Sequence, residues 1–334
     1  METTFKALSA QQLDSLCRDP FNLVNHSPVT DQPLILLDLL DTEVLSRTHQ
    51  MLEILPSLPC PVIAIAPSGS PTTLTNSVDV VVSSHKAAQP LIRNILDHPL
   101  AAMTLVQLLR HNEHSSLDDG LLAESLAYAT LQASADFRNF LASRPPLPIP
   151  DSNPEPAVLL ERQDDILHLT LNRPQQRNAY STSMRDALFE GLALQAADSS
   201  ISRTIIRGAG ACFCTGGALE EFGLAGDVAT AHAIRCSRHV GSLIAKLSSK
   251  IECHLHKACI GSGIELPAFA GHVVAKPGTF FHLPEITMGL IPGAGGTVSI
   301  VRRIGRQRTT YLALSAKRIN TGTALEWGLI DAIV

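Results

Sequence analysis

The stretch CIGSGIELPAF, from Cys259 to Phe269, combines a glycine-rich turn with a single charged residue, Glu265. An isolated carboxylate is costly to bury unless it is paired or its pKa shifts. A surface glutamate on a short helix is therefore the alternative interpretation of this window taken alone. The residues on either side of Glu265 favour a buried site that does chemistry.

Pro267 restricts where the helix of this stretch can begin, because proline is tolerated only in the first helical turn. We expect the helix to begin close to Gly263, which leaves the amides of Ser262 and Gly263 free at the positive end of the helix dipole. A second turn of this kind, facing the first, would complete a two-amide pocket for a developing oxyanion. Glu265 would lie one turn inside the helix, beside that pocket.

The segment GAGACFCTGGALEEF, residues 208–222, is the candidate for the second turn. A strand ends here in small residues, and we expect a helix from about Ala218. Gly216 and Gly217 allow a tight turn and the close approach of a ligand, leaving N–H groups unpaired. An ordinary tight turn explains the segment equally well when it is considered alone.

A third segment, FHLPEITMGLIPGAGGT, residues 281–297, places Glu285 as another lone carboxylate in an apolar setting. Its GAGG run lacks the G-x-G-x-x-G form of dinucleotide-binding turns, so it is weak evidence for a nucleotide cofactor. The glutamates and the glycine-rich turns therefore remain the candidate chemical groups.

The elements that position these groups belong to the second of two predicted parts. SRPPLPIPDSNPEP, residues 143–156, contains six prolines and interrupts regular structure. We predict an N-terminal α/β-helical domain over residues 1–142, a linker over 143–156 and a second domain over 157–334. In the second domain we expect a hairpin formed by AVLLERQ and ILHLTLNRP, a helix over residues 183–197 and a strand over residues 203–210.

In the N-terminal part, three apolar runs at residues 33–40, 60–67 and 78–84 predict buried strands. A helix is expected directly after the first strand, with Asp41 as its possible cap. Residues 87–141 have a helical pattern. No phosphate-binding loop is expected, because the sequence around Gly69 lacks the required lysine and spacing.

The composition bounds the class of protein. The chain has 334 residues, 45% of them hydrophobic and 17% charged, with a net charge of −5, which indicates a globular protein without a general affinity for nucleic acid or anionic lipid. Its seven cysteines have no framework spacing, so we expect reduced thiols and a cytoplasmic location. No signal peptide and no membrane-spanning segment are expected.

The order and spacing of the three segments, together with NRPQQRNAY at residues 172–180, resemble the crotonase superfamily of enoyl-CoA hydratases and isomerases. The resemblance runs from about residue 157 to residue 334. It implies an α/β fold of the ClpP/crotonase type, a spiral of β-β-α units, here preceded by a smaller α/β domain. It also implies an acyl-CoA thioester as substrate, a homo-oligomer (a trimer or a hexamer), and no metal or redox cofactor.

The resemblance also implies roles for particular residues. The amides of Gly217 and Ser262 would hold the thioester oxygen, and Glu265 and Glu285 would bracket a water as the catalytic pair. Four residues match the segment that lies along coenzyme A in the family: Arg177, Asn178, Ala179 and Tyr180. A 2-enoyl-CoA hydratase is the expected activity; the alternatives are an isomerase or another crotonase reaction, and a non-catalytic acyl-CoA binder.

Four departures from the family pattern bear on these alternatives. Ala218 stands where an aspartate is common, and Lys257 where a glycine is common. The chain ends at Val334, where family members usually continue into helices that close over CoA, and its N-terminal part is atypical. We hypothesise that the N-terminal helices take the place of the missing ones. Cys253, His254 and His256 have no paired ligand cluster that would favour a metal site. Cys212 and Cys214 are expected to be packed thiols.

Overall fold

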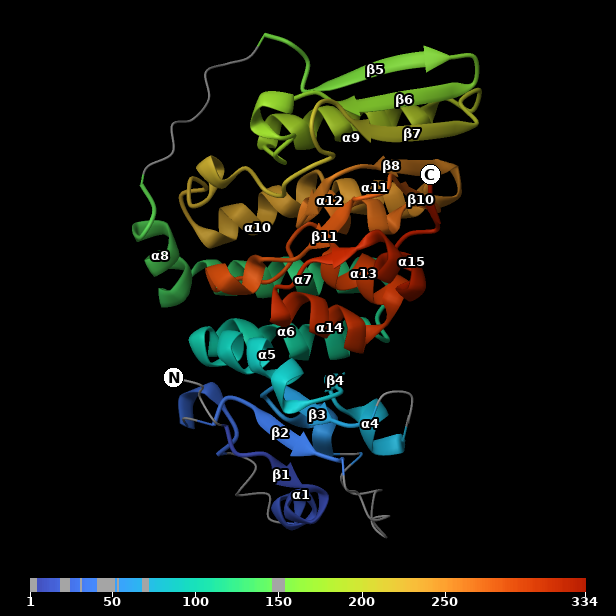
Figure 1. Cartoon of the computed structure of the whole chain (residues 1–334). Helices are drawn as coiled ribbons and strands as arrows, with labels where there is room; N and C mark the ends of the chain where they lie inside the picture. Colours follow the sequence, from blue (N-terminus) through green and yellow to red (C-terminus); the bar gives the residue numbers. More distant parts are fainter. Residues whose placement is uncertain are drawn as a thin grey trace.

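The computed structural model describes residues 5–18, 25–30, 32–40, 52, 54–67, 72–145 and 154–334 (Figure 1). The N-terminal part of the chain forms a four-stranded parallel sheet with the strand order β1-β2-β3-β4. Its strands are β1 (Leu8–Ser9), β2 (Ile35–Asp38), β3 (Val62–Ile65) and β4 (Val80–Val82). The three strands expected from apolar runs are confirmed. Continuous apolar runs are typical of parallel strands that are covered on both faces. The helix expected after β2, with Asp41 as its cap, lies almost entirely outside the described residues.

A run of helices follows the sheet and confirms the helical pattern of residues 87–141. The helices are α5 (His85–Asp97), α6 (Pro99–Asn112), α7 (Leu117–Gln132) and α8 (Ala135–Ala142). Ser84, Ser116 and Ser134 cap α5, α7 and α8 by accepting a backbone N–H of the first turn. Figure 1 shows α5, α6 and α7 between the N-terminal sheet and the second half of the chain. Helices α5 and α6 pack on α14 (Arg306–Ser315), and α6 and α7 pack on α13 (Gly296–Ile304).

The second half of the chain is built on two sheets. The larger sheet has the order β13-β10-β8-β7-β6-β5, and the smaller one has the order β12-β11-β9. The hairpin of β5 and β6 is antiparallel as expected, and the remaining pairs of the larger sheet are parallel. The strands of the larger sheet are β5 (Val158–Gln163), β6 (Ile166–Leu171), β7 (Arg203–Gly208), β8 (Ile251–Leu255), β10 (His272–Ala275) and β13 (Ala332–Ile333). Those of the smaller sheet are β9 (Ala258–Ile260), β11 (Phe280–His282) and β12 (Ile319–Asn320).

Helices cover these sheets, and one of the expected helices is replaced by a shorter turn. The expected helix over residues 183–197 is α9 (Thr182–Ala197). The prediction of a helix from about Ala218 is wrong. A single 3₁₀ turn, Leu219–Glu221, lies there, and the next helix, α10, begins at Val228. The other α-helices of the described ranges are α1 (Ala10–Cys17), α4 (Thr73–Ser77), α10 (Val228–Ser237), α11 (Val240–Lys246), α12 (Ser262–Glu265) and α15 (Thr321–Trp327).

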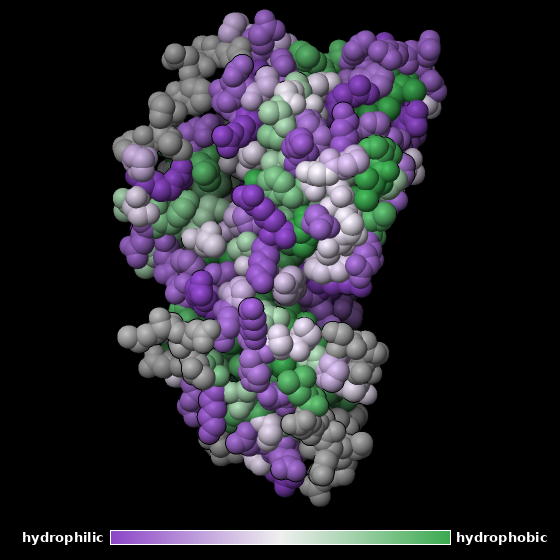
Figure 2. Space-filling model, viewed as in Figure 1, coloured by the Kyte–Doolittle hydropathy of each residue, from purple (hydrophilic) through white to green (hydrophobic). Residues whose placement is uncertain are grey.

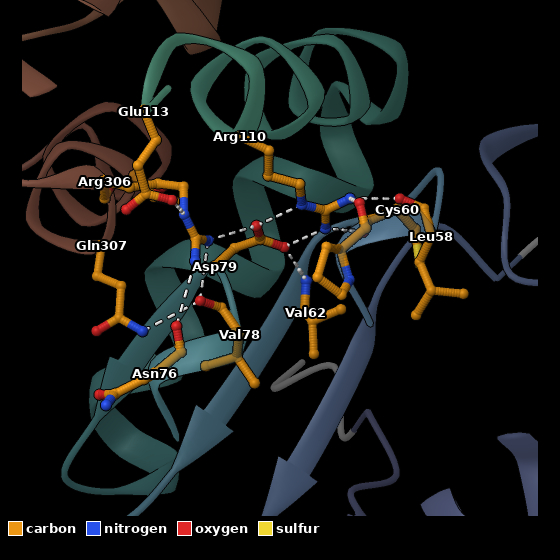
Figure 3. Close-up of polar contacts among 12 residues, drawn as sticks. Leu58, Cys60, Val62, Asn76, Val78, Asp79, Arg110, Glu113, Arg306 and Gln307 are labelled. Atoms are coloured by element: carbon orange, nitrogen blue, oxygen red, sulfur yellow. Dashed lines mark hydrogen bonds and ion pairs between the residues drawn. The ribbon is translucent and has the colours of Figure 1, made fainter. Parts of the chain in front are cut away.

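Buried ion pairs join the N-terminal sheet to α6 and α14 (Figure 3). Asp79 is 1% exposed; its carboxylate accepts hydrogen bonds from Arg110 Nε at 2.8 Å, Arg306 Nη1 at 3.1 Å and the amide of Val62 at 2.8 Å. Arg306 also donates to Glu113 at 2.8 Å. Because every charge in this group is paired, the junction between the two halves of the chain can be buried.

The surface and the core agree with a globular protein. On the face drawn in Figure 2, hydrophilic and hydrophobic residues are intermixed. One hydrophobic core contains residues of both halves, from Leu34 just before β2 to Ile330 beyond α15, so the helices α5 to α7 share their core with the second half. No helix in the described ranges is long and apolar enough to span a bilayer.

Candidate active site

The two glycine-rich turns lie side by side. Cys214, in the first turn, donates its N–H to Ala258 and accepts from the N–H of Ile260, which leads into the second turn. Gly216 has a φ of +93°, and a Cβ at this position would lie 3.2 Å from the carbonyl oxygen of Ile260. Glycine is therefore required both by the backbone conformation and by the close approach of the two turns.

Each turn presents a backbone amide without a partner in the described part of the chain. In the first turn, Tyr180 donates to Gly216 and accepts from Ala218, so the intervening N–H of Gly217 is left over. In the second turn, the first helical N–H of α12 is that of Ser262, which has no intrahelical acceptor. Gly217 and Ser262 both line the same cavity.

Glu265 is buried, as its apolar surroundings indicated, with an exposed fraction of 3%. Its Oε2 accepts the N–H of Ala294 at 2.8 Å and the N–H of Gly296 at 3.0 Å. Burial raises the pKa of this carboxyl group well above its ordinary value, and the charges of Glu285 and Glu124 raise it further. The two amide donors oppose that shift, since they favour the ionised form.

Glu285 begins a 3₁₀ turn, Glu285–Met288, directly after Pro284. Its Oε2 is buried and has no hydrogen-bond partner among the described residues, and burial raises its pKa to about 8. A Cβ built on Gly261 would lie 2.7 Å from Oε1 of Glu285 and 3.7 Å from Oε1 of Glu265. The two carboxylates therefore converge on one small region beside the second turn.

A third buried carboxylate, Glu124, was missed by sequence reasoning. It belongs to α7, is 1% exposed, and accepts the N–H of Gly295 at 2.6 Å and the N–H and hydroxyl of Thr297 at 2.9 and 2.6 Å. Burial raises its pKa to about 7. The signal was present, since Glu124 is also a lone charge within the apolar run LLAESLAYATL.

The cavity between these groups has a volume of about 540 Å³ and is lined by both halves of the chain. The N-terminal helices and the segment after them contribute Tyr128, Gln132, Phe140 and Arg144. Three further arginines line it from the second half: Arg185, Arg235 and Arg238. Sequence reasoning did not single out these arginines, since they are scattered over separate elements. The positive side chains give the cavity a lining suited to an anionic ligand.

The segment proposed to lie along coenzyme A is only partly at the cavity. Tyr180 lines it, whereas Asn178 is fully buried and bonds the amide of Arg173 and the carbonyls of Ala209 and Cys212. Arg177 is exposed and, like Ala179, does not line the cavity. Asn178 thus holds the first turn against the preceding loop.

The other residues weighed as ligands have ordinary partners. Cys212 and Cys214 are free, buried thiols, and burial raises the pKa of Cys214 to about 11. Cys253 is likewise a buried thiol. His254 pairs with Glu252 in the neighbouring position of β8, and His256 approaches the carbonyl of Gly210 at 3.1 Å. Within the described ranges no group of three potential ligands could hold a metal ion.

The two adjacent glycine-rich turns and the buried glutamates Glu265 and Glu285 thus line one cavity on a mixed α/β fold. Residues 161–334 match the family model described as enoyl-CoA hydratase/isomerase. The chain therefore belongs to the enoyl-CoA hydratase/isomerase family, which confirms the resemblance to the crotonase superfamily.

Relatives within the family include both hydratases and isomerases. The chain is 32% identical over 176 residues to the 2,3-dehydroadipyl-CoA hydratase of Escherichia coli (strain K12), and the matched segment covers 53% of this chain and 68% of that protein. It is 31% identical over 181 residues to the enoyl-CoA isomerase/hydratase fer4 of Mycosarcoma maydis, which covers 50% of this chain and 65% of that protein. The chain thus spans about two thirds of the length of these relatives.

A crystal structure of an enoyl-CoA hydratase from Mycobacterium smegmatis has the same fold over part of its length. The two structures superpose with a TM-score of 0.50 at 28% identity, covering 54% of this chain and 70% of the other. The predicted fold class, a crotonase-like α/β architecture with an additional α/β part at the N-terminus, is confirmed.

Proposed function

We propose that this protein adds water to the double bond of a 2-enoyl-CoA thioester. The observation that carries the proposal is the convergence of two buried carboxylates, Glu265 and Glu285, on the region beside the glycine-rich turns. A water molecule placed there is within reach of both groups. The free amides of Gly217 and Ser262 line the same cavity and suit a thioester oxygen.

In the proposed reaction, the amides of Gly217 and Ser262 donate hydrogen bonds to the thioester oxygen. Carbon 3 of the substrate becomes electrophilic because this polarisation withdraws electrons from the double bond. Negative charge then develops on the thioester oxygen while the water molecule adds its own oxygen to carbon 3. Each such donor lowers the barrier by about 2.7–4 kcal/mol in other oxyanion sites.

The two glutamates move the protons. One carboxylate takes a proton from the attacking water, and the other carboxyl group gives a proton to carbon 2, so that the product gains one molecule of water. Burial raises the pKa of both carboxyl groups, and the charge of Glu285 raises that of Glu265 further, so the two groups lose their protons one at a time and the pair passes through a state that holds one proton. One member is then available as base while the other is available as acid.

The cofactor and partner predictions enter here as proposals. Coenzyme A belongs to the substrate, and the arginines of the cavity lining provide positive charge for its phosphates. The roles of Arg177, Asn178, Ala179 and Tyr180 at the nucleotide stay predictions, as do a homo-oligomer and a cytoplasmic location.

The test is to mix the purified protein with crotonyl-CoA and to follow the ultraviolet absorbance of the conjugated thioester. Glu265→Gln and Glu285→Gln each remove one proton-transfer group, and we expect kcat to fall by about 10²–10⁴-fold in each. Glu326→Gln is the matched control, since Glu326 is exposed and does not line the cavity, and the variant should retain full activity.

The outcomes separate the alternatives. Loss of activity in both variants supports the two-glutamate hydratase. Full retention of activity in one of them points to a reaction that needs a single glutamate, such as the isomerisation of a double bond. Tight binding of CoA esters without turnover of crotonyl-CoA or longer 2-enoyl-CoAs would refute the enzyme and favour a non-catalytic binder.

A further inference from the structure

The segment from Ala294 to Thr297 lies between two buried carboxylates and divides its backbone amides between them. The N–H groups of Ala294 and Gly296 donate to Glu265. The N–H groups of the alternate residues, Gly295 and Thr297, donate to Glu124. Successive amides thus point to opposite sides, and the conformation of this short segment depends on both acceptors at once.

The conformation of this segment needs support from outside. Gly295 has a φ of +102°, and a Cβ on Gly296 would lie 2.5 Å from Cγ of Glu265. Small residues are therefore required, and they allow the backbone to move unless it is held. On the far side from Glu265, Glu124 takes three donors from this segment, counting the hydroxyl of Thr297.

Neighbouring side chains anchor the two partners of this contact. Asn112 of α6 donates its amide to the carbonyl and the hydroxyl oxygen of Thr297. The residue after Glu124, Ser125, bonds His232 at 2.9 Å and accepts from Arg235, so that α7 is tied to α10. The carboxylate of Glu124 is therefore presented on a fixed scaffold.

We propose that Glu124 is a positioning residue of the active site: it fixes residues 294–297 so that their amides hold the Glu265 carboxylate toward the substrate. Glu124 does not line the cavity, so its influence on the site passes through the backbone segment. This inference rests on the proposed function in that Glu265 is taken as a catalytic group. It also gives the N-terminal half of the chain a definite part in the site.

The charge of Glu124 and the amides that Glu124 fixes have opposite effects on the pKa of Glu265. Removing the Glu124 charge lowers the pKa of Glu265, whereas losing the amides of Ala294 and Gly296 raises it, because these donors favour the ionised form. The other groups that act on this carboxyl are Glu285, across the cavity, and the amides themselves. The charge of Glu265 raises the pKa of Tyr128 and of Cys214, and the charge of Arg235 lowers the pKa of Glu124. These three residues are unchanged in the variants below.

The first measurement does not require catalysis. In Glu124→Gln, one carboxylate oxygen becomes an NH₂ group that cannot accept from the segment. We expect amide hydrogen exchange of a peptide covering residues 293–298 to accelerate by about 10-fold or more. Asp118→Asn is the matched control, since it removes a carboxylate from the same helix at a side chain that is 74% exposed, and its exchange should equal that of the wild type.

The second measurement uses turnover of an enoyl-CoA. We expect kcat of Glu124→Gln to fall by about 10- to 100-fold with KM almost unchanged, and the pH profile of kcat to shift toward a higher pKa in Thr297→Val, which keeps the Glu124 charge. Thr297→Val removes one donor to Glu124 and should show a smaller loss, and Thr297→Ser should restore activity. If Glu124→Gln does not fold, the Thr297 pair carries the test.

Unchanged exchange over residues 293–298 in a folded Glu124→Gln variant would overturn the proposal, as would a pH profile of Thr297→Val that shifts toward a lower pKa. A protein that turns over no enoyl-CoA would refute the proposed function alone, because the exchange experiment still decides whether Glu124 holds the segment.

Discussion

Two groups of buried acidic residues connect the N-terminal half of the chain to the second half, and they differ in their partners. Asp79 meets the guanidinium groups of Arg110 and Arg306 in addition to a backbone amide. Glu124, Glu265 and Glu285 meet backbone amides and a threonine hydroxyl, and one oxygen of Glu285 has no partner in the described part of the chain. Both groups are buried: Asp79 and Glu124 are 1% exposed, Glu265 is 3% exposed and Glu285 is 9% exposed.

The comparison shows that burial alone does not mark a catalytic carboxylate. An arginine pair neutralises Asp79 and makes it a structural charge, since the ion pairs compensate the loss of hydration. The three glutamates lack such neutralisation, and burial raises the pKa of each of them. Groups with raised pKa values that face a cavity can exchange protons with a ligand, which a saturated ion pair cannot do.

Asp79→Ala should cause the largest change in stability. It leaves Arg110 and Arg306 buried without their shared acceptor, and we expect the free energy of unfolding to fall by roughly 3–5 kcal/mol. Urea unfolding followed by circular dichroism measures this. A loss below about 1 kcal/mol would mean that the arginines find other partners, and the cluster would then not be the structural junction proposed here.

Gly261→Ala should disturb the group of buried glutamates by displacing the carboxylate of Glu285. Gly261 has a φ of +51°, and the added methyl would lie 2.7 Å from Oε1 of Glu285. We expect a fall of about 100-fold in kcat/KM for an enoyl-CoA, because the carboxylate must move.

Gly226→Ala is the matched control for this substitution. Its φ is +68°, but a Cβ there meets nothing within 4 Å. It should carry the same backbone strain of about 1 kcal/mol and retain activity. Equal activity losses in the two variants would attribute the effect to strain rather than to the carboxylate.

Glu285→Gln tests the raised pKa through stability. A carboxyl group with an ordinary pKa of 4.5 and a folded-state pKa of about 8 binds more protons in the folded state between these values. The wild type therefore loses stability as pH rises from 4.5 toward 8, and the glutamine variant lacks this loss. We expect the variant to gain about 1 kcal/mol or more relative to the wild type between pH 5 and pH 8. Parallel stability curves would show that Glu285 ionises normally.

Glu113→Gln should have the smallest effect. Glu113 pairs with Arg306 at the edge of the Asp79 group, but its side chain is 38% exposed. We expect a loss of at most about 1 kcal/mol in urea unfolding. A loss as large as that of Asp79→Ala would mean that the exposed edge contributes as much as the buried centre.

The sequence predicted those parts of the fold and site whose signals are local. Apolar runs located β2, β3 and β4, and Pro267 located the start of α12 close to Ser262. The apolar surroundings of Glu265 correctly indicated a buried carboxylate.

The signals that failed depend on distant partners. The apolar run around Glu124 was a local signal of burial, but its role depends on Gly295 and Thr297, which no local pattern connects to α7. The helix expected at Ala218 is one 3₁₀ turn, because the N–H of Ala218 is used by Tyr180 and the next amides close a tighter turn. The burial of Asn178 likewise depends on the loops that it joins, and its role at coenzyme A stays a prediction.

The contact between Glu124 and the segment at Gly295 has a consequence for the order in which the protein is assembled. The two partners are 171 residues apart, so α7 leaves the ribosome long before the amides that donate to Glu124 have been synthesised. Pairings of such long range form late, because the intervening chain must first be brought together. The active site should therefore be among the last regions to fold. In a nascent chain that stops short of residue 294, Glu124 of α7 has none of the backbone donors that it has in the folded protein.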